Sequence, residues 1–370
     1  MSTLKTPFRY DFVGSFLRPE KLKAAKKAFE EGTITQEELD RVTDECVTEI
    51  VAKQKVAGYH AITDGEFRRK FWHLDFMWGF EGVTHEKDGG GVQFNGEMAD
   101  LEATYLVGKV KAKVHPFVEY FKFLKQFEDE QTVAKYTIPA PAQMYQQMIV
   151  PQNIEQTRKF YATDDELIED IGKAYQDVIK QFYSAGCRNL QLDDCTWGAI
   201  VGDAAKQRYQ SLGVDIEEVK ARLLKVNNLA LEGRPEDMVI TSHICRGNYH
   251  STFFTSGPYD SVADYVFAQE HVDALLWSMM MRDPVVAPLA KVSPDKKVVL
   301  GLITTKKPEL EDKDKVIARI HEAEKYIPLE RLCLSPQCGF ASCEIGNKIT
   351  EEQQWAKLAL VKEIAEEVWK

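Results

Sequence analysis

The chain has 370 residues, enough for one large domain, and a formal net charge of -11. This charge argues against nucleic-acid binding, which needs clustered basic residues, and against binding to anionic membrane surfaces. No run approaches the roughly eighteen consecutive apolar residues of a membrane-spanning helix. The N-terminus lacks an apolar signal segment, and seven cysteines without disulfide-type spacing predict reduced thiols in a cytoplasmic protein.

Short apolar runs, most of them followed by helical sequence, repeat along the chain. The first run covers residues 10–16, and helices are expected from about Pro19 and from about Thr35, where a capping-box pattern begins. Further strands are predicted over residues 61–66, 136–141, 189–194, 238–245, 273–278, 298–303 and 332–338. Apolar residues at helical spacing predict helices over 164–185 and 312–326, and a last helix is expected over 351–369.

Eight strands alternating with helices predict an α/β fold of the (β/α)8 TIM-barrel type, formed by residues 1–370 as one domain. The alternative is a doubly wound open sheet, which usually has fewer strands and, in dinucleotide-binding members, a glycine-rich first turn. The sequence contains neither a GxGxxG nor a GxxxxGK[ST] motif. Alternating residues between 89 and 115 suggest a β-hairpin inserted before the third strand.

Chemically capable side chains stand mostly at the carboxyl ends of the predicted strands. In a (β/α)8 barrel these ends form the active site. The residues concerned are Ser15, Glu66, Asp193, Asp194, His243, Cys245 and Cys338. The basic residue Arg18, close to the first strand end, is expected to meet a carboxylate of a substrate.

His243 and Cys245 are two residues apart on a predicted strand, so their side chains point to the same face. Cys338, at the end of the last strand, is placed to converge on them. One imidazole and two thiolates form a soft ligand set that favours Zn²⁺. The alternative is a histidine satisfied within the barrel and cysteines acting as small apolar residues. The remaining cysteines are interpreted as structural: Cys46, Cys187, Cys195, Cys333 and Cys343.

Three carboxylates, those of Glu66, Asp193 and Asp194, are expected on nearby strand ends. Such groups repel one another unless a cation lies among them, and Mg²⁺ or a substrate ammonium would serve. Alternatively, one carboxylate caps the next helix and another pairs with Arg68 or Arg69. The aromatic stretch over residues 71–80 is interpreted as core in preference to a stacking wall for a flat ligand.

Together these motifs resemble the cobalamin-independent methionine synthase family, in its short stand-alone form. That form corresponds to the C-terminal catalytic half of the two-domain enzyme. Each motif alone is weak, and their order on successive strand ends carries the resemblance. The motifs are Gly14-Ser15-Phe16, Asp64-Gly65-Glu66, Gln191-Leu192-Asp193-Asp194, His243-Ile244-Cys245 and Ser335-Pro336-Gln337-Cys338-Gly339.

The resemblance implies a zinc-dependent methyltransferase that converts homocysteine to methionine with 5-methyltetrahydrofolate or another methyl donor. It implies that the metal ligands are His243, Cys245 and Cys338. It also implies that the amino-acid end of homocysteine is held by Ser15, Glu66 and Asp193, with the two carboxylates pairing with its ammonium.

Two positions depart from the family pattern. The family's carboxylate ligand at the end of the sixth strand is replaced by Ser278, and the loop after the seventh strand has Lys306 and Lys307 but no histidine to protonate a leaving group. Three other functions therefore stay open. One is a related zinc enzyme acting on another thiol, the second is a binding protein with a degenerate metal site, and the third is a Mg²⁺ enzyme.

Overall fold

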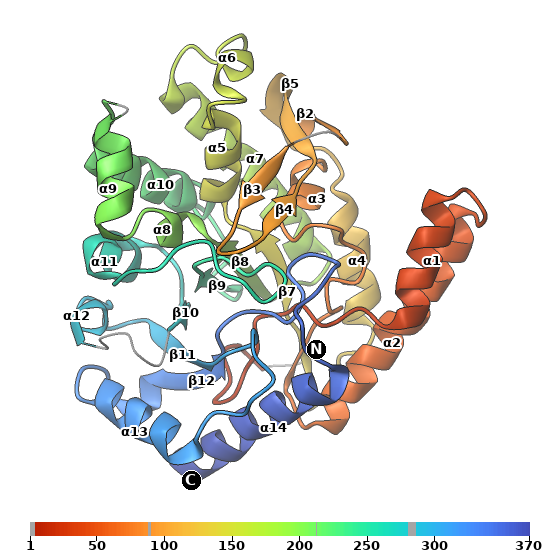
Figure 1. Ribbon diagram of the computed structural model, residues 1–370, viewed down its shortest axis with the longest axis vertical. Helices are drawn as coiled ribbons and strands as arrows, with labels where there is room; N and C mark the ends of the chain where they lie inside the picture. The colour runs from red at the N-terminus through yellow and green to blue at the C-terminus, as the bar shows by residue number, and fades with distance from the viewer. Residues whose placement is uncertain (1–3, 88–89, 212, 280–285) are drawn as a thin grey trace.

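The computed structural model describes residues 4–87, 90–211, 213–279 and 286–370. Its central feature is a six-stranded parallel sheet in the order β12-β11-β10-β9-β8-β7, so neighbours in the sheet are also neighbours in chain order (Figure 1). Its strands are almost wholly buried, which explains why the sequence shows them as continuous apolar runs. They are β7 (Tyr136–Pro139), β8 (Asn189–Asp194), β9 (Val239–Ile244), β10 (Ala274–Ser278), β11 (Lys297–Ile303) and β12 (Leu332–Pro336).

Helices fill the connections between these strands and lie around the sheet (Figure 1). Two predicted helices have the expected bounds to within one residue, and Thr163 and Thr350 cap them with side-chain hydrogen bonds. The helices after β7 are α5 (Pro141–Ile149), α6 (Ile154–Thr157), α7 (Asp164–Ser184), α8 (Thr196–Ala199), α9 (Gly202–Ser211), α10 (Ile216–Ala230), α11 (Asp260–Gln269), α12 (Val286–Leu289), α13 (Lys313–Glu324), the 3₁₀ turn η1 (Leu329–Arg331) and α14 (Glu351–Val368).

The N-terminal part adds α1 (Glu20–Glu30), α2 (Gln36–Val56) and a two-stranded parallel sheet of β1 (Ala61–Ile62) and β6 (Val133–Ala134). A capping box at Thr35 starts α2, as the sequence predicted. A single residue, Lys135, separates β6 from β7, so one stretch of chain faces β1 along its first part and β8 along its second.

The first predicted strand, residues 10–16, is not a regular strand. It makes an isolated parallel bridge from Tyr10 to Leu334 of β12, and on its other side Gly14 accepts a hydrogen bond from the Thr63 hydroxyl at 2.7 Å. Gly14 has φ +154°, a conformation that L side chains rarely adopt, and this breaks the ladder. Within the described residues the pairings thus form separate six-stranded and two-stranded parallel sheets.

Two antiparallel pairs, not one hairpin, stand between β1 and β6. β2 (Glu81–Glu86) pairs with β5 (Ala103–Lys111), and β3 (Gly91–Gln93) pairs with β4 (Met98–Asp100). The insertion therefore begins earlier than predicted, and the expected start at Gly89 lies outside the described residues. The short helices α3 (Leu74–Met77) and α4 (Pro116–Lys125) flank it.

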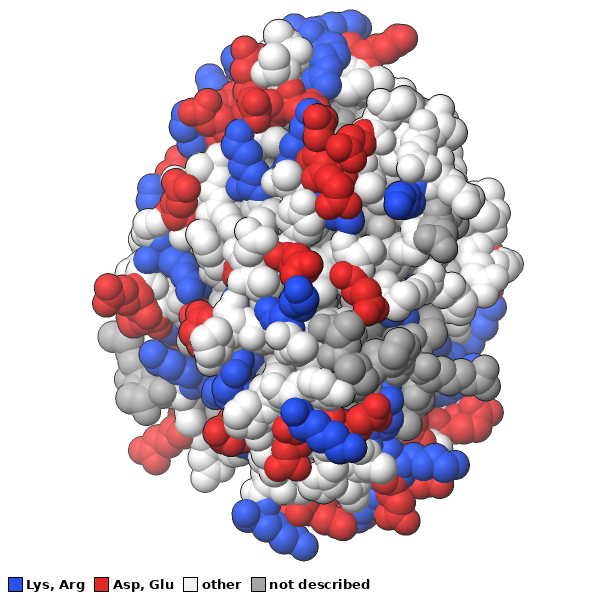
Figure 2. Space-filling view, turned by 90° about the vertical axis from the view of Figure 1, so that its left-hand side faces the viewer, with Lys and Arg blue, Asp and Glu red and all other residues white. Residues whose placement is uncertain are grey.

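Charged side chains of both signs are spread over the surface. Figure 2 shows basic and acidic side chains interspersed over one face. Among the described residues, no helix combines the length and the apolar character that crossing a membrane requires.

Candidate active site at the carboxyl ends of the strands

A cavity of about 260 Å³ opens at the carboxyl ends of the parallel strands. The chain brings to its wall most of the residues that the sequence analysis selected, namely Ser15, Glu66, Asp193, His243 and Cys245. Cys338 is buried directly behind this wall, next to the lining residue Gly339. Side chains as far apart in the sequence as Ser15 and Cys338 therefore meet in one place, since parallel strands end at a common edge.

His243, Cys245 and Cys338 form the soft-donor cluster, with one donor atom from each within 4.8 Å of the others. The two-residue spacing on β9 puts His243 and Cys245 on one face, and the Sγ atoms of Cys245 and Cys338 are 3.2 Å apart. Ser278, at the end of β10, places its hydroxyl 3.7 Å from the Cys338 sulfur. All three donors are buried, which favours a site closed to bulk water.

Charge within the cluster is divided between the imidazole and one thiol. Burial opposes protonation of His243, but hydrogen bonds to Asp193 and Cys338 raise its pKa to about 10. A hydrogen bond from Cys245, assisted by Lys306 and His243, lowers the pKa of Cys338 well below its usual range despite burial. The cluster therefore favours a Cys338 thiolate beside a positively charged ring.

The donor set fits a zinc ion. Zn²⁺ prefers one or two thiolates and imidazole nitrogens in tetrahedral geometry, and donors within 4.8 Å of one another suit bonds of about 2.0–2.3 Å. Asp193 Oδ1 lies 3.1 Å from His243 Nδ1, the outer contact that typically orients a ligating histidine through its other nitrogen. These three side chains leave a fourth coordination position for a thiol.

Glu66 enters the cavity from a strained loop. Its φ is +62°, a region that non-glycine residues seldom occupy outside functional sites, and its amide donates to Asp64 Oδ1 at 2.9 Å. One carboxylate oxygen accepts from Thr137 at 2.8 Å and lies 3.3 Å from Arg69 Nη1. The other has no hydrogen-bond partner among the described residues. Burial raises the pKa of Glu66, Arg69 opposes this, and the Asp193 charge adds to the rise.

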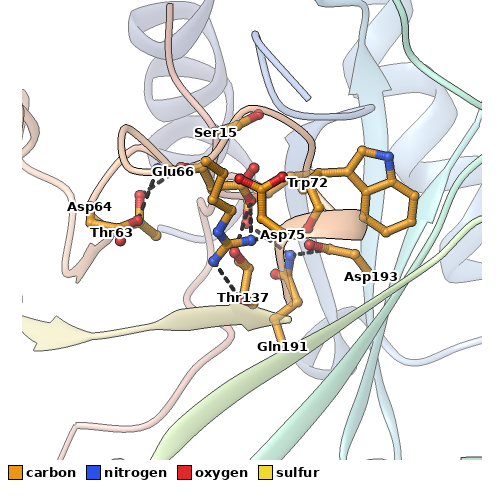
Figure 3. Close-up of polar contacts among 12 residues, drawn as sticks. Ser15, Thr63, Asp64, Glu66, Trp72, Asp75, Thr137, Gln191 and Asp193 are labelled. Carbon is orange, nitrogen blue, oxygen red and sulfur yellow. Dashed lines mark hydrogen bonds and ion pairs between the residues drawn. The ribbon is translucent and has the colours of Figure 1, made fainter. Parts of the chain in front are cut away.

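Asp193 and Ser15 complete the polar wall (Figure 3). Asp193 Oδ1 accepts from the Gln191 side chain at 2.8 Å in addition to its contact with His243. Ser15 Oγ accepts from the Ala341 amide at 3.3 Å. Two buried carboxylates and a hydroxyl beside a thiol-binding cluster suit a small molecule that carries an ammonium group and a sulfur atom.

Asp194 has a different role. Its side chain accepts from the Thr196 amide at 2.8 Å and from Asn227 Nδ2 at 2.9 Å, and Asn227 also donates to Glu270 at 2.8 Å. It is thus the carboxylate that bonds to the start of the next helix, α8, as one alternative proposed. Glu270 is buried in this network rather than at the cavity, so it does not replace the missing carboxylate ligand.

Arg18 does not line the cavity. Its buried guanidinium donates to backbone carbonyls, including those of Glu66 and Ala341 at 2.8 Å each. These contacts tie the Glu66 loop to the segment after β12. The structure therefore supports a positioning role for Arg18, and contact with a substrate carboxylate stays a prediction.

The outer part of the cavity is aromatic and amide-rich. Trp72 and His73 line it, so part of the aromatic stretch interpreted as core in fact faces the cavity, whereas Phe76 and Phe80 are core. Burial lowers the pKa of His73 to about 3, which makes its ring neutral. The other lining residues here include Phe94, Gln143, Gln146, Tyr249 and Phe254. Trp72 and Asp193 line the same cavity.

Cys195 and Cys343 both line the cavity, although the sequence analysis interpreted both as structural. The neighbouring thiols of Cys195 and Cys338, together with burial, raise the pKa of Cys245 well above its usual range. Cys195 follows Asp194 directly, as Cys245 follows Ile244 on the neighbouring strand, but only the register of β8 against β9 brings the two cysteines side by side.

The family model described as the cobalamin-independent synthase catalytic domain matches residues 10–366. The chain belongs to this family. It is 41% identical over 368 residues to the uncharacterized protein YxjH of Bacillus subtilis strain 168, covering 99% of this chain and 96% of YxjH. This family member thus resembles, over almost its full length, a relative whose activity is itself not described.

Solved structures agree with this assignment. A putative vitamin-B12 independent methionine synthase from Listeria monocytogenes is 35% identical, with a TM-score of 0.79 over 99% of each chain. A B12-independent methionine synthase from Shewanella sp. W3-18-1, solved in complex with selenomethionine, has a TM-score of 0.70 at 19% identity, covering 98% of this chain and 97% of that one. The second likeness is one of fold.

Proposed function

We propose that this chain transfers a methyl group to the thiol of homocysteine, forming methionine, with Zn²⁺ held by His243, Cys245 and Cys338. The observation that carries the proposal is that one cavity brings together a soft-donor cluster and a pair of buried carboxylates. The soft-donor cluster would take a thiolate, and the carboxylates of Asp193, which hydrogen-bonds to His243, and of Glu66 in the same cavity would take an ammonium. Family membership and the selenomethionine complex of the Shewanella protein support an amino acid of this kind.

When bound, Zn²⁺ would keep the substrate thiol deprotonated near neutral pH, which makes it nucleophilic. Glu66 and Asp193 would pair with the ammonium of homocysteine, and Ser15 would hold the same end of the molecule. Because these groups are buried and partly fixed by Thr137, Gln191 and Arg69, they would hold the amino-acid end in one place and so keep the sulfur at the metal ligands.

The methyl donor would occupy the outer part of the cavity, beside Trp72. Transfer forms the sulfur–methyl bond and leaves an electron pair on the donor atom, which takes up a proton unless the donor is cationic. The loop after β11 offers no histidine for this step, and its Lys306 Nζ lies 3.7 Å from the Cys338 sulfur. The donor is 5-methyltetrahydrofolate or a different methyl compound, and the assay below separates them.

We also propose that the strands close into a single (β/α)8 barrel over residues 1–370. Backbone contacts support it on both sides of the first segment, since Asp11 N donates to Leu334 O at 3.0 Å and Phe16 N to Gly65 O at 3.1 Å. An experimental structure in which residues 10–16 do not contact β12 or the segment after β1 would contradict closure of the barrel. Because thiolate ligands need reduced cysteines, we propose a reducing, cytoplasmic setting.

The test is methionine formation by the zinc-loaded protein from homocysteine, with a panel of folate and other methyl donors. Turnover with at least one donor, lost in Cys338→Ala, would support the proposal. The replacement of a carboxylate ligand by Ser278 favours a second candidate, a protein that binds homocysteine without turnover. Tight homocysteine binding with no methionine from any donor would favour that candidate and contradict ours.

A further inference from the structure

The β8–β9 pairing continues beyond the last paired residues of the two strands. Asp193 lies opposite His243 and Asp194 opposite Ile244. The Cys245 amide then donates to the Asp194 carbonyl at 3.2 Å, which carries the ladder to the next position. Cys195 therefore lies beside Cys245. In a parallel pair, residues side by side in register direct their side chains to the same face.

Cys195 differs from the other cysteines in exposure. It is only half-buried, whereas Cys46, Cys187, Cys245, Cys333, Cys338 and Cys343 are buried. It lines the cavity together with Cys245, and the two thiols interact. A fourth soft donor therefore lies beside the proposed zinc ligands, in the wall of the cavity.

Within the part of the chain that the structure describes, the cluster has three protein ligands, from His243, Cys245 and Cys338. The end of β10 supplies the Ser278 hydroxyl, a neutral group that suits Zn²⁺ less well than a thiolate. In its present rotamer, the Cys195 thiol does not belong to the set of donor atoms within 4.8 Å of one another, which is formed by His243, Cys245 and Cys338. The Cys195 side chain is less buried than those of the other cysteines, and its backbone follows the hydrogen bond from the Cys245 amide to the Asp194 carbonyl, so a change of side-chain rotamer is the movement that the proposal requires.

We propose that Cys195 is the fourth donor to the metal in the substrate-free protein and that the thiol of the substrate takes its place. The exchange balances, because the incoming thiol gives its proton to the departing Cys195 thiolate and the charge of the site is unchanged. This inference rests on the metal site of the proposed function. It explains how a chain without the carboxylate at Ser278 completes its coordination in the absence of substrate.

The test uses the full chain loaded with Co²⁺, whose thiolate charge-transfer absorption reports the number of bound thiolates. In Cys195→Ser we expect this absorption to fall by about one third, since two of three thiolates remain in the soft ligand set. Added homocysteine should restore it in Cys195→Ser and leave it nearly unchanged in the wild type. The matched control is Cys343→Ser, a buried cysteine of the same cavity wall, which should absorb as the wild type does.

Alkylation gives a second readout that does not depend on the variant. One equivalent of Zn²⁺ should protect Cys195 from a thiol reagent, and homocysteine should expose it again. Equal absorption of wild type and Cys195→Ser, or alkylation of Cys195 that Zn²⁺ does not slow, would overturn the role of Cys195 alone. Failure of Co²⁺ to bind to the wild type would instead contradict the metal site and therefore the proposed function as well.

Discussion

Asp193 Oδ1 lies 3.1 Å from Nδ1 of His243, so one carboxylate contacts a proposed metal ligand and lines the proposed substrate site. The same oxygen accepts from Gln191, which fixes the carboxylate. The proposed metal and substrate sites thus share the Asp193 carboxylate. Substitutions of Asp193 should therefore change both zinc affinity and homocysteine affinity, and different substitutions should change them by different amounts.

Two substitutions at Asp193 separate its charge from its hydrogen bond. Asp193→Asn keeps an acceptor for His243 but loses the charge, so we expect zinc affinity to change little and homocysteine binding to weaken about 10- to 100-fold. Asp193→Ala loses both the charge and the acceptor for His243. It should therefore also weaken zinc binding about 10- to 100-fold, the effect of removing the group that orients a ligating histidine. Chelator competition and homocysteine titration measure these effects. Equal zinc affinity in the two variants would contradict the orienting role.

Zinc content should depend on Cys338 and not on a neighbouring buried cysteine. Cys338→Ser removes the proposed thiolate ligand, so we expect zinc per chain to fall sharply. Cys333→Ser is the matched control, because Cys333 lies on β12, just before Cys338 in the chain, but packs with Leu276 and Val299 and does not line the cavity. Elemental analysis of both proteins measures the zinc content. Unchanged zinc per chain in Cys338→Ser would show that Cys338 is not a metal ligand.

Gly339 makes room for Ser15. A Cβ at Gly339 would lie 1.9 Å from Ser15 Oγ, so Gly339→Ala must displace the serine. We expect the homocysteine KM to rise by about tenfold, the effect of losing one hydrogen bond, with zinc content unchanged. Gly108→Ala is the control, since its Cβ would approach nothing closer than 3.6 Å. A KM equal to that of the wild type would exclude Ser15 from substrate binding.

The buried network behind β8 predicts a pH dependence of stability. Burial, with the Asp194 charge, raises the pKa of Glu270 to about 8. Between about pH 4.5, where the unfolded carboxyl titrates, and pH 8, the folded state binds more protons, so stability falls as pH rises. Glu270→Gln removes this proton uptake and keeps an acceptor for Asn227.

We therefore expect the free energy of unfolding of Glu270→Gln to fall less steeply with rising pH than that of the wild type. At pH 8.5 the variant should be the more stable of the two, by on the order of a few kcal/mol. Near pH 4.5 the two proteins should have nearly equal free energies of unfolding. Urea unfolding at the two pH values measures the difference. A wild type that gains stability relative to Glu270→Gln as pH rises would contradict the assignment.

Much of this arrangement was predictable because parallel strands end at one edge. Period-two alternation placed His243 and Cys245 together, and strand order brought Cys338 to them. Contacts between irregular segments were not predictable. Arg18 donates to the carbonyl of Ala341, 323 residues away, and the bridge of Tyr10 to Leu334 replaces a regular first strand.

Cys195 was missed for a related reason. Its relation to Cys245 depends on the register of β8 against β9, and spacing along one strand carries no information about register.

The central claim is tested most directly by zinc content, measured by elemental analysis on protein purified without chelator, with and without homocysteine. The proposed ligand set predicts about one zinc ion per chain in both samples, the single site of a catalytic centre. Absence of zinc even with homocysteine present to supply a thiolate would contradict a zinc-dependent methyltransferase and leave the cavity as a site for binding alone.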